Sequence, residues 1–274
     1  MKKRLVSSVP RHRNVVLVTG ASTGIGYELC KLFAHDRYDL VIVARDGKRL
    51  SQVASELCQE YGIGVYSIPC DLSVSSAAVT LYKKLKQKEL TVDILVNNAG
   101  FGLSGSFSKT SLKDELAMIQ VNITSLTHLT KLVLPGMIAR KSGKILNVAS
   151  TAAFQPGPLM AVYYATKAYV LLFSEALARE IQGTGITVSV LCPGPTRTQF
   201  QQRARIGQSR IIDTKLIMDA TTVATAGYRG LMKGKTIIIP GLSNKISSQA
   251  HRLLPRKLVS KIVYTIQKER NILE

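Results

Sequence analysis

Apolar runs alternate with amphipathic stretches along most of the chain. Runs rich in Val, Ile and Leu predict strands, and apolar side chains at helical spacing predict helices between them. Uninterrupted apolar strands are typical of a parallel sheet that helices cover on both faces. The pattern therefore predicts an α/β fold, a single domain built on a doubly wound, mainly parallel seven-stranded sheet. We place strands at 15–19, 40–44, 65–69, 94–97, 144–148, 187–191 and 236–239, and helices at about 24–36, 46–62, 74–88, 112–140, 158–182 and within 199–232.

Two segments depart from this rhythm. Residues 196–232 are long, polar and weakly periodic, which is typical of a cap over a binding site. Beyond about residue 243, apolar residues recur at roughly helical spacing and basic residues fill the other face. Such a tail either packs on its own domain with a solvated basic face or lies on a membrane or a partner. We expect a basic extension at 1–13, the main domain at 14–240 and a basic amphipathic tail at 241–274.

Composition narrows the class of protein. Of the 274 residues, 46% are hydrophobic and 20% are charged, as in ordinary globular chains. No apolar run approaches the roughly 20 residues that span a bilayer, and no signal-peptide pattern follows the basic start. The cysteines lack the spacing of a zinc site or a disulfide framework, so we expect reduced thiols, no metal and a cytoplasmic location. These cysteines are Cys30, Cys58, Cys70 and Cys192.

The formal net charge of +20 is unusual. It suits a nucleic-acid partner, an anionic membrane surface, or an acidic substrate and cofactor. The Lys and Arg residues are diffuse, with no basic tract interleaved with aromatic residues, so we expect no nucleic-acid partner. Weak contact of the tail with an anionic membrane surface stays open as an alternative.

A glycine-rich segment follows the first predicted strand and opens the first predicted helix. It reads T-G-A-S-T-G-I-G over residues 19–26, which is not the G-x-G-x-x-G spacing. Glycines allow a tight turn and close approach to a pyrophosphate, and the helix N-terminus offers free N–H groups. A plain tight turn is the alternative. The candidate contacts are Gly20, Ser22, Thr23, Gly24, Ile25 and Gly26.

The end of the second strand predicts which nucleotide binds. An acidic residue there binds the ribose 2′-hydroxyl of NAD, whereas an Arg pairs with the 2′-phosphate of NADP. Arg45 comes first and Asp46 follows. The forked guanidinium suits a phosphate, and Asp46 either faces the ribose or caps the next helix. We therefore favour NADP(H) over NAD(H).

Two further strand ends carry candidate cofactor contacts. Asp71 and Leu72 follow the third strand, where a carboxylate is placed to accept from an adenine amino group; a turn-forming Asp is the alternative. Asn98, Ala99 and Gly100 follow the fourth strand, where small residues let a ribose approach the backbone. A plain strand-ending turn explains these three equally well.

Tyr163 and Lys167 lie four residues apart in a predicted helix and so share one face. A nearby cationic amine stabilises a phenolate, and such a pair works as an acid or a base on a carbonyl/alcohol pair. Alone, the spacing is common in structural helices. Ser150 at the end of the fifth strand is placed to hold a substrate oxygen. Asn122 stands in an apolar helical stretch, where its amide needs partners; a satisfied core asparagine is the alternative.

Taken together, these motifs resemble the short-chain dehydrogenase/reductase family over about residues 14–240. The match keeps T-G-x-x-x-G-I-G, Asp71, N-N-A-G at 97–100, Asn122, Ser150, Y-x-x-x-K at 163–167, and P-G at 193–194 with Thr198 after it. The resemblance implies a Rossmann-type catalytic domain. The chain is similar to the bacterial branch of the family near hydroxysteroid and 3-oxoacyl reductases. This likeness implies a lipophilic carbonyl or secondary alcohol substrate.

Site roles follow from that resemblance. Tyr163 would exchange the substrate proton, and Lys167 would bind the nicotinamide ribose and lower the tyrosine pKa. Ser150 would polarise the carbonyl, and Asn122 would position a water linking Lys167 to a proton relay. A further segment would hold the nicotinamide amide and pyrophosphate, through Pro193, Gly194, Thr196 and Thr198.

One departure concerns the cofactor. Many NADP-using members carry a basic residue just before the second glycine of the turn, where this chain has Thr23. Arg45, with Ser22, therefore has to bear most of the 2′-phosphate recognition.

An NADP(H)-dependent oxidoreductase is thus the main hypothesis. The alternatives are a nucleotide-binding redox sensor without turnover, and a basic protein of membrane surfaces or nucleic acids. The family likeness also implies a homo-oligomer, a dimer or tetramer formed through the long helices at 112–140 and 158–182. Ala152, Phe154, Pro156 and Leu159 suggest an apolar substrate wall.

Overall fold

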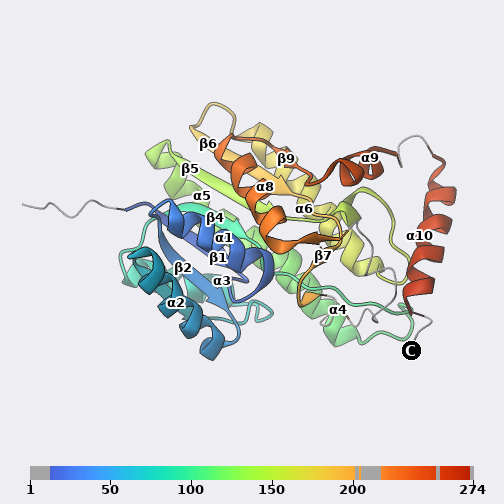
Figure 1. Ribbon diagram of the computed structural model, residues 1–274, viewed down its shortest axis with the longest axis horizontal. Helices are drawn as coiled ribbons and strands as arrows, with labels where there is room; N and C mark the ends of the chain where they lie inside the picture. The colour runs from blue at the N-terminus through green and yellow to red at the C-terminus, as the bar shows by residue number, and fades with distance from the viewer. Residues whose placement is uncertain (1–12, 201–203, 205–216, 251–253, 272–274) are drawn as a thin grey trace, which may run out of the picture.

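The computed structural model describes residues 13–200, 204, 217–250 and 254–271. Its main sheet has seven strands in the order β3-β2-β1-β4-β5-β6-β9, and every pairing is parallel (Figure 1). The predicted doubly wound sheet is confirmed, and it is wholly parallel. Its strands are β1 Val15–Thr19, β2 Asp39–Ala44, β3 Val65–Pro69, β4 Val92–Asn97, β5 Gly143–Val148, β6 Ile186–Leu191 and β9 Ile237–Ile238.

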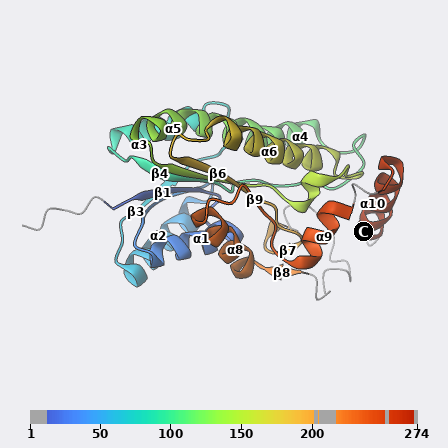
Figure 2. The same ribbon diagram turned by 90° about the horizontal axis from the view of Figure 1, so that it is seen from above.

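Helices cover both faces of the sheet, as Figure 2 shows. One face carries α1 (Gly24–His35), α2 (Gly47–Tyr61) and α8 (Ala220–Met232). The opposite face carries the remaining helices of the main domain, and a π-helical turn, η1 (Gln120–Ser125), joins two of them. These are α3 Ala77–Gln87, α4 Leu112–Ile119, α5 Leu126–Arg140 and α6 Ala161–Glu180.

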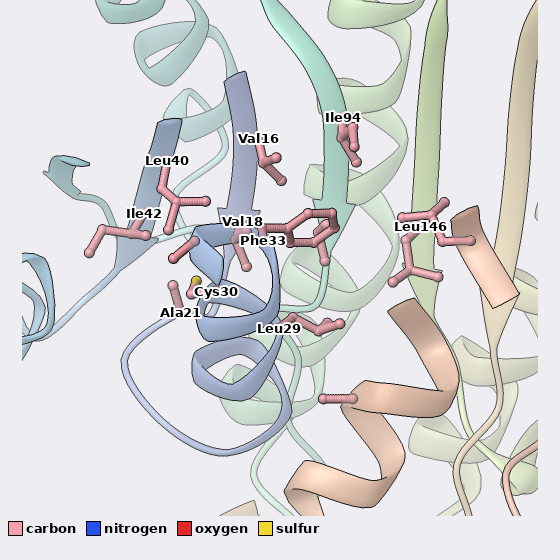
Figure 3. Close-up of a cluster of buried hydrophobic side chains, with 14 of the residues drawn as sticks. Val16, Val18, Ala21, Leu29, Cys30, Phe33, Leu40, Ile42, Ile94 and Leu146 are labelled. Carbon is pink, nitrogen blue, oxygen red and sulfur yellow. The ribbon is translucent and has the colours of Figure 1, made fainter. Parts of the chain in front are cut away.

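The core lies on both sides of the sheet because alternate strand residues point to opposite faces. Val16 and Val18 of β1 pack with Phe33 of α1 on one face (Figure 3). Val15 and Leu17 of the same strand belong to the core cluster of the other face. Every residue of β1 is buried, so the loop that follows this strand starts from a rigidly held position.

Local capping fixes where α2 begins and ends. The Asp46 side chain accepts a hydrogen bond from the backbone N–H of Arg49 at 3.0 Å, which caps the helix. Gly62 ends it in the left-handed region, with φ of 60°. Asp46 is therefore the helix cap, the second of its two expected roles, and Arg45 is an exposed residue between the end of β2 and this cap.

The segment expected to form a cap has two parts. Thr196–Arg197 (β7) pairs with Met218–Asp219 (β8) in a small second sheet, and residues 201–203 and 205–216 lie outside the described residues. Assigning 220–232 to the cap was wrong, because α8 is a core helix whose Val223 and Leu231 are fully buried.

The tail forms two helices, α9 (Leu242–Ala250) and α10 (Arg256–Asn271). Figures 1 and 2 both place them at one end of the molecule, beyond the small sheet. Residues 1–12 of the expected basic extension lie outside the described chain. In the part that the structure describes, no helix is both long enough and apolar enough to cross a membrane.

Candidate active site

A cavity of about 790 Å³ lies where the carboxyl ends of the parallel strands meet. Such an edge is where doubly wound sheets bind their ligands. The cavity brings together all but two of the site residues predicted from the sequence; Gly26 and Asn122 lie behind its wall. The predicted residues that line it are Gly20, Ser22, Thr23, Gly24, Ile25, Arg45, Asp71, Leu72, Asn98, Ala99, Gly100, Ser150, Tyr163, Lys167, Pro193, Gly194, Thr196 and Thr198.

The glycine-rich turn is shaped by contacts that exclude side chains. Gly20 has φ of 67°, and a Cβ there would lie 2.7 Å from the Asn98 amide nitrogen. A Cβ on Gly26 would overlap the Gly20 carbonyl oxygen and the same amide. The turn therefore presents bare backbone to the cavity, which leaves the room that a pyrophosphate needs.

Asn98 holds this turn in place. Its side-chain amide donates to the carbonyl oxygens of Thr19 and Gly20, at 2.9 and 3.0 Å. The Thr19 hydroxyl in turn accepts from the backbone N–H groups of Asn98 and Ala99, both at 3.1 Å. The amide of Asn98 thus braces the turn from behind. The sequence reasoning assigned it a cofactor contact, but the structure gives its side chain a supporting role.

The N-terminus of α1 points its dipole at the cavity. Within the described part of the chain, the N-cap residue Thr23 makes no side-chain hydrogen bond to this end, and the first turn of α1 holds no acidic residue. The free N–H groups are left for an anion. Together with the glycine cradle, this end of the helix fits the pyrophosphate of a dinucleotide.

Arg45 and Asp71 line the cavity on the same side as the glycine-rich turn. Asp71 Oδ1 accepts from the Ser73 backbone N–H at 3.0 Å and the Ser73 hydroxyl at 2.8 Å. Partial burial opposes the charged form, but these bonds and the nearby Arg45 outweigh it and lower the pKa of Asp71. The carboxylate is thus ionised and forms a turn, and Arg45 is an exposed cation beside it.

Tyr163 and Ser150 form the reactive end of the cavity. Ser150 caps a short 3-10 helix, η2 (Thr151–Phe154), by accepting from the Ala152 N–H at 3.1 Å. Burial raises the pKa of the Tyr163 hydroxyl well above its ordinary value, and a hydrogen bond with Ser150 works against that rise. Desolvation of the phenolate dominates here, and the lowering of this pKa expected from Lys167 stays a prediction. Tyr163 carries its proton at neutral pH.

Lys167 is buried one helical turn after Tyr163, with 6% of its surface exposed. Its Nζ donates to the Val148 carbonyl oxygen at 2.9 Å and lies 5.8 Å from the centre of the Tyr163 ring. Burial lowers the pKa of this amine from 10.5 to about 8. A Cβ on Gly100 would come within 3.3 Å of Nζ, so that glycine keeps the approach to the amine open.

Asn122 lies in the π-helical turn between α4 and α5, and its amide is fully engaged. Nδ2 donates to the Phe101 carbonyl oxygen and to the Thr166 hydroxyl, both at 3.0 Å. Oδ1 accepts from the Phe101 N–H at 3.1 Å. Both backbone groups of Phe101 are thereby held. π-turns of this kind often occur at functional sites, and the expected water relay through Asn122 stays a prediction.

The segment after β6 is positioned from both sides. The carbonyl oxygen of Pro193 accepts from the Thr151 N–H at 2.8 Å and from the Ser150 hydroxyl at 3.4 Å. The Asn244 side chain of α9 packs against Gly194, where any Cβ would collide with it. The sequence analysis did not identify Asn244, because no local motif marks a residue that supports a loop fifty positions away.

The reactive end of the cavity is also lined by side chains that the sequence analysis missed. Tyr164 follows the reactive tyrosine, and its hydroxyl accepts from the Gln267 amide of α10 at 2.8 Å. Gln267 is 2% exposed although it lies in the tail. Of the expected apolar wall only Ala152 lines the cavity; Phe154 packs in a separate core cluster. The main additions are Phe101, Val121, Gln155, Met160, Tyr164, Phe200, Ile217 and Gln267.

A glycine cradle at a helix N-terminus, next to a buried Tyr–Lys pair and a serine, defines an oxidoreductase that uses a nicotinamide nucleotide. The sequence profile of the short chain dehydrogenase family matches residues 14–209, and the chain belongs to this family.

Individual relatives agree with this assignment. A ketoacyl reductase of a Nostoc species, HetN, is 31% identical over 241 residues, 87% of this chain and 82% of that protein. A short-chain dehydrogenase of Sphingobium yanoikuyae, solved with NADPH, is 33% identical with a TM-score of 0.79 and coverage of 89% and 94%. An alcohol dehydrogenase of Comamonas testosteroni, specific for bulky-bulky ketones, is 29% identical with a TM-score of 0.74 and coverage of 88% and 93%.

Proposed function

We propose that this chain is an NADPH-dependent carbonyl reductase that acts on a lipophilic ketone, including the 3-oxoacyl type. The observation that carries the proposal is the buried Tyr163 hydroxyl beside Ser150, one helical turn before Lys167, in the wall of a cavity of about 790 Å³. A hydroxyl that holds its proton at neutral pH is a donor, and reduction of a ketone requires a proton at the carbonyl oxygen.

The chain's residues divide the work of this step. The Ser150 hydroxyl holds the carbonyl oxygen beside Tyr163, which gives its proton to that oxygen as the alcohol forms. When bound, reduced nicotinamide supplies the hydride to the carbonyl carbon. Lys167, with its lowered pKa, orients the nicotinamide ribose and, while charged, favours the phenolate left on Tyr163. The residues present fit a nicotinamide nucleotide, because Gly20, Gly24 and Gly100 leave the cavity wall open where the backbone must approach the nucleotide.

Arg45 supports NADPH as the preferred cofactor. Its exposed guanidinium stands just after β2, and one carboxylate oxygen of the neighbouring Asp46 is engaged as the α2 cap. The similar Sphingobium dehydrogenase was solved with NADPH. The nicotinamide contacts proposed for Thr196 and Thr198 rest on their position in the cavity wall.

The lining and the relatives support a lipophilic substrate. Phe101, Met160 and Phe200 give the reactive end an apolar wall, and Phe200 lies against Tyr163 with ring centres 5.3 Å apart. The similar proteins include a ketoacyl reductase and an alcohol dehydrogenase for bulky ketones. A 3-oxoacyl thioester and a bulky ketone are therefore the two substrate classes to test first.

Exposed apolar side chains support a homo-oligomer built on the long helices. Leu112 and Leu116 of α4 are 70% and 54% exposed, and Leu172 of α6 is 65% exposed. Large apolar side chains exposed on neighbouring helices are typical of an interface. We infer a dimer or tetramer through these helices.

The test measures NADPH consumption over a panel of ketones and 3-oxoacyl thioesters for wild type, Tyr163→Phe and Tyr164→Phe. Loss of the proton donor lowers kcat by roughly 10²–10⁴-fold and leaves the NADPH Kd unchanged. Tyr164→Phe is the matched control, because it removes a neighbouring hydroxyl that we assign no proton transfer. Full activity in Tyr163→Phe would contradict the proposal, and tight NADPH binding without turnover on any carbonyl would favour the sensor.

A further inference from the structure

Helix α10 has two neighbouring rows of side chains, and only one of them packs on the domain. Val259, Val263 and Gln267 follow each other every four residues and are buried, with 6%, 5% and 2% of their surface exposed. The neighbouring row, Leu258, Ile262 and Ile266, has the same spacing but is 44%, 42% and 42% exposed. This helix therefore uses half of its apolar surface and presents the other half outward.

Further exposed apolar residues precede this row. Leu242 and Ile246 of α9 are 72% and 62% exposed, and Leu254 just before α10 is 41% exposed. Figures 1 and 2 both place α9 and α10 at the same end of the molecule. We call the exposed side of these two helices the tail surface, defined by Leu242, Ile246, Leu254, Leu258, Ile262 and Ile266.

The charge around the tail surface is mostly positive. The sequence from 220 to 271 contains ten Lys and Arg residues and one acidic residue, Glu269. On α10, Lys257, Lys261 and Lys268 are exposed and share one side of the helix, whose centre lies about 120° from that of the apolar row at 100° per residue. Lys245 of α9 is also exposed. A helix with an open apolar row and a cationic side has the character of one that lies flat in a membrane interface.

This charge distribution argues against a second copy as the occupant. A symmetric dimer brings the same patch of both copies together. Here it would set the lysines of one tail surface against those of the other, with Glu269 as the single acidic residue between 220 and 271 to pair with them. An anionic bilayer supplies both an apolar interior and negative headgroups, so it matches both properties at once.

We propose that the tail surface docks this protein on anionic membranes, with α10 lying in the headgroup plane. The inner side of the same helix lines the cavity through Gln267. The docking surface therefore adjoins the substrate end of the site. This inference is independent of turnover, so it stands or falls separately from the carbonyl reductase.

The first experiment is sedimentation of the full-length protein with lipid vesicles. Vesicles of phosphatidylcholine with phosphatidylglycerol are compared with vesicles of phosphatidylcholine alone. We expect binding to the anionic vesicles to be at least about tenfold tighter, since each basic residue near the surface adds to the attraction. Added salt should weaken it. Absent binding to anionic vesicles, or equal binding to both kinds, would overturn the proposal.

Two triple variants separate the apolar and the charge contributions. Leu258→Gln/Ile262→Gln/Ile266→Gln removes the open row, and Lys257→Gln/Lys261→Gln/Lys268→Gln removes the cationic side. Each should weaken binding by about tenfold or more. The matched control, Lys83→Gln/Lys88→Gln/Lys113→Gln, removes the same charge from exposed lysines elsewhere and should stay within about twofold of wild type.

Circular dichroism and thermal unfolding verify that each variant is folded. Light scattering then addresses the competing occupant. If the apolar variant changes the oligomeric state but binds vesicles as wild type does, the tail surface is a contact between copies and the proposal fails. If the control lysines weaken binding as much as those of α10, the attraction comes from net charge alone, and the proposal fails as well.

Discussion

The two halves of the cavity are built in different ways. The nucleotide half, formed by residues 19–26, 44–46, 70–72 and 97–100, is mostly backbone held by hydrogen bonds such as those of Asn98. The substrate half is formed by side chains from 151–164, 199–200 and 267, which lie far apart in the sequence. Backbone geometry tolerates almost no change, whereas side chains can be exchanged one at a time. Cofactor binding therefore depends on the fold itself, whereas substrate preference can change without a change of the fold.

The largest expected effect comes from Gly26→Ala in the nucleotide half. The added Cβ overlaps the Gly20 carbonyl oxygen and the Asn98 amide, so the turn must shift. We expect NADPH affinity to fall by about a hundredfold or more, because small displacements of positioning groups have such costs. Isothermal titration measures it. Gly136→Ala in α5 is the control, since its Cβ meets only the flexible end of Arg140 at 3.3 Å. Unchanged NADPH binding in Gly26→Ala would break the comparison.

Arg45→Ala removes a side chain from the nucleotide half without moving its backbone. Loss of a charge-assisted contact to the 2′-phosphate should raise the KM for NADPH by about tenfold or more and leave that for NADH nearly unchanged. Steady-state kinetics with both cofactors tests this. Arg49→Ala, which removes a nearby arginine paired with Glu56, should leave both constants alone. Equal losses for NADPH and NADH would refute the assignment of Arg45.

Lys167 lies between the two halves of the cavity, and its charge depends on pH. The folded protein lowers the pKa of this amine to about 8, so the ammonium is present below that pH and is lost above it. Ketone reduction should weaken as pH rises through about 8, well before the tyrosine loses its proton. The pH profile of kcat/KM measures it. A profile that stays level far above this pH would show that the charge of Lys167 is dispensable.

Gln267→Leu tests the substrate half and has the smallest expected effect. It removes the hydrogen bond to the Tyr164 hydroxyl while keeping the volume of the side chain. A neutral hydrogen bond contributes about 1 kcal/mol, so the KM for a bulky ketone should change about threefold to tenfold. NADPH binding should not change. Tyr164→Phe should give the same result, and the double variant no further loss; additive losses would show that the two residues act independently.

The nucleotide half and the sheet were predictable because their signals are local. Buried strands such as Val15–Thr19 show as apolar runs, and the Tyr163–Lys167 spacing places both side chains on one helix face. Some strands begin a residue or two before the predicted start, at Asp39 and Val92 for example, because pairing with a neighbour extends them.

The errors share a different cause. Helix α8 was assigned to a cap because it packs with small residues, which carry little hydrophobic periodicity. A Cβ on Gly227 would come within 2.8 Å of Leu191, so the helix sits directly on β6. In α10, the buried and exposed apolar rows have the same four-residue period, so the sequence does not tell which row faces the domain. Long-range packing alone decides both cases.

The π turn that holds Asn122 has a consequence for how this chain tolerates insertions and deletions. A π turn contains one residue more than an α turn, so deleting a single residue within 120–125 would convert it into regular α-helix. The α turn covers the same rotation with one residue fewer, so the side chains that follow would keep their orientation, and Leu129, Val133 and Met137 would stay in the core. A deletion after Ser125, within the regular α-helix of α5, would instead rotate every following side chain by about 100° about the axis. The π turn is therefore the place in this helical stretch where the chain can lose one residue and keep its packing.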